Sequence, residues 1–142
     1  IWNANMKMWT HGPDKEPVVF KAEENNKLLG QGTWLLSDFK SNFDGVDFYG
    51  HAQLCFDPVK KKFVGTWIDN MTPHLSTMQG VYDEEKRILE MKTTGVDPQT
   101  GEKKTGRNTT KWIGKDRRVF TAYNNTKDGE VKQFEIEYSR KK

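Results

Sequence analysis

The 142-residue sequence contains almost no cysteine, and this limits its chemistry. Cys55 is the only cysteine, so neither an internal disulfide nor a metal site built from several cysteines is possible. We expect Cys55 to be a small packed residue rather than a nucleophile. The three histidines, His11, His51 and His74, form no H-x-x-x-H or H-x-H spacing, so the sequence predicts no metal site. No cofactor is evident, although haem, which needs only one axial histidine, stays open.

The chain also lacks any apolar run near the ~20 residues that a membrane-spanning helix needs. We therefore expect a soluble protein without a membrane span. No secretion signal is present, but the chain opens at Ile1 rather than at a methionine. We expect that the N-terminus has been trimmed, so the sequence does not distinguish a cytoplasmic protein from an exported one.

The chain also lacks a large excess of positive or negative charge, because 23 Lys and Arg residues oppose 20 Asp and Glu residues and leave a net charge of +3. A nucleic-acid-binding face needs clustered basic residues beside stacking aromatic rings. The basic excess near the C-terminus falls instead in turns and at alternate strand positions, which is typical of a solubilising surface. We therefore expect no nucleic-acid partner.

Hydrophobic residues make up only 34% of the sequence, whereas aromatic residues make up 12%, with five Trp, eight Phe and four Tyr. Large rings at few positions can line a hollow interior, which favours a barrel over a helical bundle. No segment shows a sustained helical period. A chain of 142 residues has an ordinary size for one domain, and we expect residues 1–142 to form a single one.

Turn-forming residues recur along the chain and separate segments of about ten residues in which apolar and polar side chains alternate. Asp begins most of these turns, as at Asp57, Asp83 and Asp97, because its side chain bonds nearby backbone N–H groups. Consecutive strands joined by tight turns form a meander, which closes into an antiparallel up-and-down barrel. The pattern predicts an all-β fold with strands near residues 1–9, 17–24, 28–39, 46–56, 62–70, 75–82, 87–95, 104–113, 117–125 and 130–140.

A turn at Val59-Lys60 predicts which side chains of the central hairpin share the apolar, inward face. The predicted pairs are Phe56 with Phe63, Leu54 with Gly65, Ala52 with Trp67, and Gly50 with Asp69. The next hairpin is predicted to pair Met78 with Met91, Gly80 with Leu89 and Tyr82 with Arg87. We also place Trp2, Trp34 and Trp112 in the interior. Bulky rings beside glycines leave space, so we expect a cavity.

Asp69 is the most informative single residue, since it follows Trp67 by two positions and shares its inward face. Two interpretations are open. Asp69 anchors a ligand or acts as a general base, or it holds backbone N–H groups of the 70–74 loop. His74 is predicted near the same rim, which makes an Asp69–His74 pair conceivable, whereas His51 falls on an outward position. Gly30 and Gly32 lack the helix of a phosphate-binding loop and are expected to relieve crowding where a strand bends.

Several motifs together are distinctive. They are Phe48-Tyr49-Gly50, Phe56-Asp57-Pro58, the run from Lys60 to Asp69, Gly80-Val81-Tyr82-Asp83 and Asp97-Pro98-Gln99-Thr100-Gly101. With the opening Trp2…Met8-Trp9 and the closing run from Glu135 to Lys141, nearly the whole chain resembles a bacterial family known as a domain of unknown function, DUF1579. The chain departs from the family pattern at Ala52 and Cys55, where the family tends to have glycine. The resemblance implies a lipocalin-like (calycin-type) barrel and brings no established activity.

The leading hypothesis is a barrel that binds a small apolar or aromatic molecule in its interior. The ligand-binding residues that it predicts are Trp34, Trp67, Asp69, His74, Met78 and Tyr82. An alternative is a small enzyme, a hydrolase or an isomerase, in which Asp69 and His74 transfer protons. A third hypothesis is a non-catalytic structural or interaction domain whose barrel is filled by its own side chains, with Val64 and Ile68 on the contact face of a homodimer.

Overall fold

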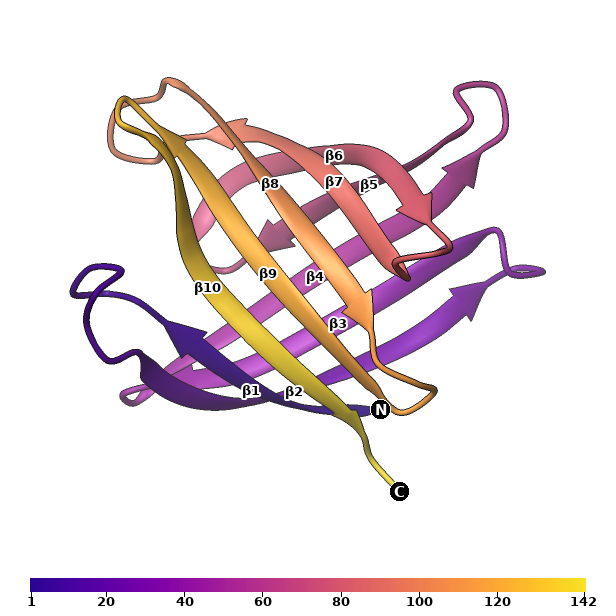
Figure 1. Cartoon of the computed structure of the whole chain (residues 1–142), viewed down its shortest axis with the longest axis horizontal. Helices are drawn as coiled ribbons and strands as arrows, with labels where there is room; N and C mark the ends of the chain where they lie inside the picture. Colours follow the sequence, from indigo (N-terminus) through magenta and orange to yellow (C-terminus); the bar gives the residue numbers. More distant parts are fainter.

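The computed structural model describes residues 1–142, and its ten strands close into one antiparallel barrel. Each strand pairs with its neighbours in sequence, and β1 pairs with β10 to complete the circle (Figure 1). The predicted all-β, up-and-down barrel of about ten strands is confirmed. The strands are β1 (Trp2–Met8), β2 (Val18–Leu29), β3 (Trp34–Phe43), β4 (Val46–Asp57), β5 (Lys62–Asp69), β6 (Thr72–Asp83), β7 (Ile88–Val96), β8 (Lys103–Trp112), β9 (Arg117–Thr126) and β10 (Gly129–Arg140).

Aspartate side chains hold several of the turns between strands. Asp57 Oδ1 accepts hydrogen bonds from the backbone N–H groups of Val59 and Lys60, at 2.9 and 3.1 Å. Asp83 Oδ1 accepts one from the backbone N–H of Lys86 at 3.0 Å. Asp97 Oδ1 does the same for the backbone N–H of Gln99 at 2.8 Å. The turn residues recognised in the sequence therefore act locally, through their own side chains.

The turn between β2 and β3 lies later in the chain than expected. The run Asn25-Asn26-Lys27 was predicted to separate two strands, but β2 continues through it to Leu29. Gly30 and Gly32 form the turn, with φ values of +64° and +89°. Residues with a side chain rarely adopt such positive φ values. The prediction that these glycines relieve crowding within a strand is therefore wrong.

The central hairpin has the predicted register. β4 and β5 pair Phe56 with Phe63, Leu54 with Gly65, Ala52 with Trp67, and Gly50 with Asp69. The next hairpin differs by two residues, since Met78 pairs with Thr93, Gly80 with Met91 and Tyr82 with Leu89. The turn has four residues, as assumed, but it lies one residue later in the chain and ends at Arg87, which has a φ of +56°. A shift of two leaves every side chain on its predicted face, because the side-chain period of a strand is two.

The two ends of the barrel differ in what they carry. One end, called here the terminal end, holds both chain termini and the turns that follow β2, β4, β6 and β8; it lies to the right in Figure 1. The other end, called the loop end, holds the connections that follow β1, β3, β5, β7 and β9. The structure contains no helix, and therefore none that is long and apolar enough to cross a membrane.

The fully buried core occupies only part of the interior. Its six side chains come from β1, β3 and β10, and they are Trp2, Ala4, Met6, Phe39, Ile136 and Tyr138. The partly buried apolar side chains packed against it come mainly from the neighbouring strands. Because the fully buried core is confined to the side of β1, β3 and β10, it leaves space for a cavity in the rest of the barrel interior.

Candidate functional site: the barrel cavity

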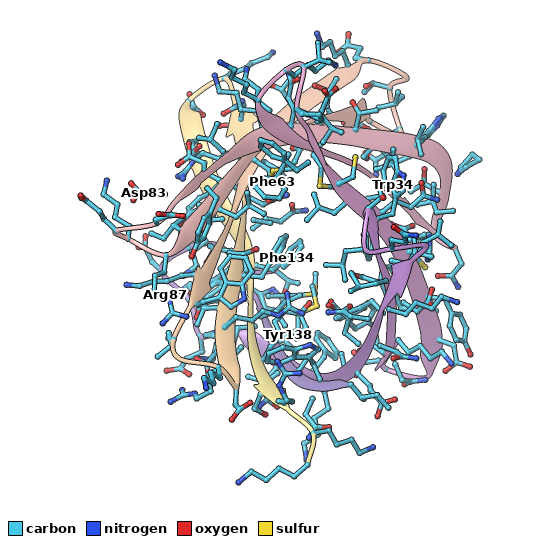
Figure 2. All side chains as sticks on the ribbon, turned by 90° about the vertical axis from the view of Figure 1, so that its right-hand side faces the viewer. Trp34, Phe63, Asp83, Arg87, Phe134 and Tyr138 are labelled. Atoms are coloured by element: carbon cyan, nitrogen blue, oxygen red, sulfur yellow. The ribbon has the colours of Figure 1, made fainter.

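A cavity of about 480 Å³ lies inside the barrel, and all ten strands contribute to its wall. This volume falls within the ~300–1,000 Å³ of ordinary small-molecule sites. Figure 2 looks onto the terminal end and shows an open centre beside Phe134 and Tyr138. Most of the lining side chains are apolar. The interior is therefore a hollow of ligand size rather than a fully packed core.

Two glycines allow close packing in the barrel, one of them against the cavity residue Trp67. The ring of Trp67 lies against Gly50, where a Cβ atom would stand 2.1 Å from the Cη2 atom of the ring. At Gly80 a Cβ atom would meet the backbone oxygen of Glu90 at 1.7 Å, so the neighbouring strand comes closer than a side chain allows. Both positions require glycine, because a side chain at Gly50 would overlap the Trp67 ring and a side chain at Gly80 would overlap the backbone of β7.

Aromatic rings line the part of the cavity nearest the loop end. Phe43 belongs to the lining and is in edge contact with Phe20, which does not belong to it, with ring centroids 4.8 Å apart. The row continues from Phe43 to Phe48 at 5.3 Å and from Phe48 to Trp67 at 6.4 Å. Across the barrel, two further rings stack at 5.9 Å, those of Phe120 and Phe134. Such rings offer a large apolar surface to an occupant at few positions.

A charged cluster lines another part of the cavity. Glu24 is buried, and its carboxylate accepts a hydrogen bond from Nη2 of Arg118 and another from the hydroxyl of Tyr138, the latter at 2.8 Å. The guanidinium of Arg118 stacks 3.8 Å from the ring centroid of Tyr138 and 4.9 Å from that of Trp2. Burial, and then the nearby Glu24 carboxylate, raise the pKa of Tyr138 well above its ordinary value of 10.0. The cluster is charge-balanced and joins β1, β2, β9 and β10.

Asn26 introduces an unpartnered polar atom into the cavity wall. Its Oδ1 atom is buried and accepts no hydrogen bond from the protein. Buried polar atoms in folded proteins nearly always have a partner. Ser37, which pairs with Asn26 across β2 and β3, also lines the cavity. The buried side chains of Asn108 and Thr110 on β8 do so as well.

Three of the residues predicted from the sequence line the cavity, namely Trp67, Asp69 and Met78. Two others lie outside its lining. Tyr82 is on the inward face of β6 near the terminal end, where its ring contacts that of Trp112 edge to face at 5.8 Å. His74 is half-buried beside an irregularity in the pairing of β5 and β6.

Trp34 lies on the outer face of the barrel, so its predicted inward position is wrong. The side chains of β3 that line the cavity are at odd positions, such as Leu35, Ser37 and Phe39. Trp34 pairs instead with Cys55, in the outward row of β4. Because Trp34-Leu35-Leu36 is a continuous apolar run, the sequence does not reveal which of its members face inward.

Asp69 makes local contacts only. Its Oδ2 atom accepts a hydrogen bond from the indole Nε1 of Trp67 at 2.8 Å, and its Oδ1 atom accepts one from the backbone N–H of Met71 at 3.0 Å. No hydrogen bond joins Asp69 to His74. The geometry matches the interpretation in which Asp69 holds the loop after β5, and it positions the Trp67 ring over Gly50. The acid–base pair of the enzyme hypothesis is not assembled.

Glu24, Asn26 and Arg118 line the cavity but were not predicted to face the interior. The inward positions of β2 are Phe20, Ala22, Glu24 and Asn26, so continuing the alternation from Phe20 would have found two of them. Because the strand was predicted to end at residue 24, the alternation was not followed as far as Asn26. A contact on the outer face, between His51 Nδ1 and Asp38 Oδ1 at 2.7 Å, was also not predicted. No group of three or more His, Cys, Asp or Glu side chains is placed to hold a metal ion.

A second hollow, of about 780 Å³, lies mainly against the outward side chains of β5 to β8. Four paired threonines form a row across it, and they are Thr66, Thr77, Thr94 and Thr105. At its edge Arg107 donates two hydrogen bonds to Glu130, at 3.0 and 2.7 Å, which raise the pKa of Arg107. Few apolar side chains line this outer groove.

A comparison with known protein families agrees with the motifs recognised in the sequence. The chain belongs to the family described as a protein of unknown function (DUF1579), whose model matches residues 1–140. No curated protein matches the chain.

Proposed function

We propose that this family member, with a lipocalin-like barrel, binds a small apolar or aromatic molecule in its interior cavity. The observation that carries the proposal is the cavity of about 480 Å³, bounded by side chains of all ten strands and lined mostly by apolar groups. A smaller void would be closed by the surrounding side chains, and a polar one would hold water.

The aromatic row from Phe43 through Phe48 to Trp67 supplies the main contact surface of the proposed site. Met78 adds a flexible side chain that adapts to irregular shapes. Burying apolar surface is worth about 25 cal/mol per Å² before the cost of immobilising the ligand. The outer groove is larger, but its polar lining gives an apolar molecule little surface to bury.

A dye titration tests this function. N-phenyl-1-naphthylamine, whose emission rises in apolar surroundings, should bind saturably to the wild-type protein. Ala52→Phe places a ring in the cavity beside Trp67 and should weaken binding at least about tenfold by removing ligand volume. Val81→Phe adds the same ring on the exposed outer face and should leave the affinity unchanged.

Circular dichroism should show that both variants keep the wild-type strand content. Absence of saturable binding to the wild-type barrel would overturn the proposed function. So would equal weakening by Ala52→Phe and Val81→Phe, because the dye would then be bound somewhere other than in the cavity.

A further inference from the structure

Asn108 and Thr110 on β8 are polar side chains within an apolar stretch of the cavity wall. Both residues are buried, each with an exposed fraction of 7%, and both line the cavity. Their four partners across β7 and β9 are all apolar, and they are Met91, Leu89, Ala122 and Phe120. The side chains directly beside Asn108 and Thr110 therefore offer them no hydrogen bond.

The polar atoms of these two side chains are open to the cavity, unlike Asn26 Oδ1. None of them makes a hydrogen bond within the protein, yet the shielded side-chain atom without a partner is Asn26 Oδ1 alone. The polar atoms of Asn108 and Thr110 are therefore within reach of a water-sized molecule, and the space that they face is the cavity. Because polar groups inside a protein nearly always have a partner, we expect an occupant of the cavity to supply it.

The chemistry of the two side chains indicates which polar group fits them. The amide of Asn108 and the hydroxyl of Thr110 can each both donate and accept a hydrogen bond. The two residues lie two positions apart on one strand, about 7 Å along its axis, so one compact group placed between them can contact both. An amide or a hydroxyl group, which also donates and accepts, matches this pair.

The charged residues of the cavity wall indicate that this group is uncharged. Both arginines of the wall are paired with carboxylates, Arg118 with Glu24 and Arg107 with Glu130. Asp69 adds a carboxylate that forms no ion pair, and no lysine lines the cavity. An anionic group on a ligand would therefore be desolvated without a free counter-ion, which is costly.

We propose that Asn108 and Thr110 bind an uncharged amide or hydroxyl group of the cavity ligand, whose aromatic or apolar body packs against the rings of the wall, such as Phe120 beside Thr110. This inference rests on the proposed function and names the chemical class of its ligand. Aromatic amides and phenols fit the class, whereas aromatic carboxylates do not.

Three naphthalene probes of similar shape test the polar group: 2-naphthamide, the anion 2-naphthoate, and 2-isopropylnaphthalene, which makes no hydrogen bond. Displacement of N-phenyl-1-naphthylamine at pH 8 gives their affinities. 2-Naphthoate should bind at least about tenfold more weakly than 2-naphthamide, because its charge has no free counter-ion in the cavity. Thr110→Val and Asn108→Leu should each weaken 2-naphthamide about two- to tenfold and should not weaken 2-isopropylnaphthalene.

Thr109→Val is the matched control, because Thr109 lies between the two residues on β8, faces outward and is not part of the cavity lining. It should leave all three affinities as in the wild type. Without ligand, Thr110→Val should also unfold at a urea concentration no lower than the wild type, since it keeps the side-chain shape and removes a hydroxyl that bonds to no group of the protein. A lower urea midpoint would mean that the hydroxyl stabilises the fold, and it would overturn the inference.

The outcomes separate the two proposals. Failure of both the dye and every probe to bind would overturn the proposed function. If 2-naphthoate binds as tightly as 2-naphthamide, or if neither Asn108→Leu nor Thr110→Val weakens 2-naphthamide more than Thr109→Val does, the barrel still binds apolar molecules but the inferred ligand class is wrong.

Discussion

Replacing Arg118 by methionine should lower the free energy of unfolding by about 3 to 5 kcal/mol, because Glu24 would remain buried without its cation. Both side chains are nearly covered, with exposed fractions of 12% for Arg118 and 9% for Glu24. Methionine keeps an unbranched, flexible side chain that still packs on Trp2 and Tyr138. Most of the loss therefore reports the uncompensated carboxylate.

Adding Glu24→Leu to Arg118→Met should recover at least half of the lost stability, because an apolar pair has no charge to desolvate. The hydroxyl of Tyr138, which donates to Glu24 at 2.8 Å, would then lack its acceptor. A buried donor left unpaired costs about 1 to 3 kcal/mol. A third substitution, Tyr138→Phe, should remove most of that remaining cost.

Urea-induced unfolding, followed by circular dichroism, measures these free energies. Lys7→Met is the control, because it removes an ion pair at the surface. Lys7 Nζ lies 2.8 Å from Glu137 Oε1, and the two side chains are 34% and 42% exposed. Such a surface pair is worth less than about 1 kcal/mol. If Arg118→Met costs no more than Lys7→Met, or if Glu24→Leu fails to restore stability, the buried cluster does not have the energetic role argued above.

Two further predictions concern the wall and the alkaline stability of the barrel. Gly80→Ala should destabilise the fold by more than about 3 kcal/mol and Gly50→Ala by about 1 to 3 kcal/mol, because the added Cβ meets the backbone of Glu90 in the first case and the side chain of Trp67 in the second. Urea midpoints compare the two, and equal losses would contradict the distinction between a fixed backbone and a side chain that can move. Above pH 10, where the unfolded chain releases the Tyr138 proton and the folded chain retains it, stability should fall by up to about 1.4 kcal/mol per pH unit from this group. Tyr138→Phe should remove that part of the slope relative to Tyr49→Phe, a control at an exposed position, and identical slopes for the two variants would refute the raised pKa of Tyr138.

The register of β4 and β5 could be predicted because its causes are local. Asp57 holds the turn through bonds to Val59 and Lys60, and the alternation on either side of that turn decides which face is apolar. The β2–β3 connection was misplaced because Gly30 and Gly32 were expected inside a bent strand, whereas their positive φ values form the turn itself. Trp34 was assigned to the wrong face, since its neighbours are apolar on both parities and give no alternation to follow.

Alternation and turn chemistry act over a few residues, so the ten-strand barrel and the inward faces of its central hairpins can be predicted from the amino-acid sequence. Which polar groups meet inside the barrel depends instead on how distant strands pair. Glu24 lies 94 residues from Arg118 and 114 from Tyr138. Their strands come together only because β1 pairs with both β2 and β10 when the sheet closes. The cluster of Glu24, Arg118 and Tyr138 therefore forms only when the barrel closes, and no local pattern in the chain predicts it.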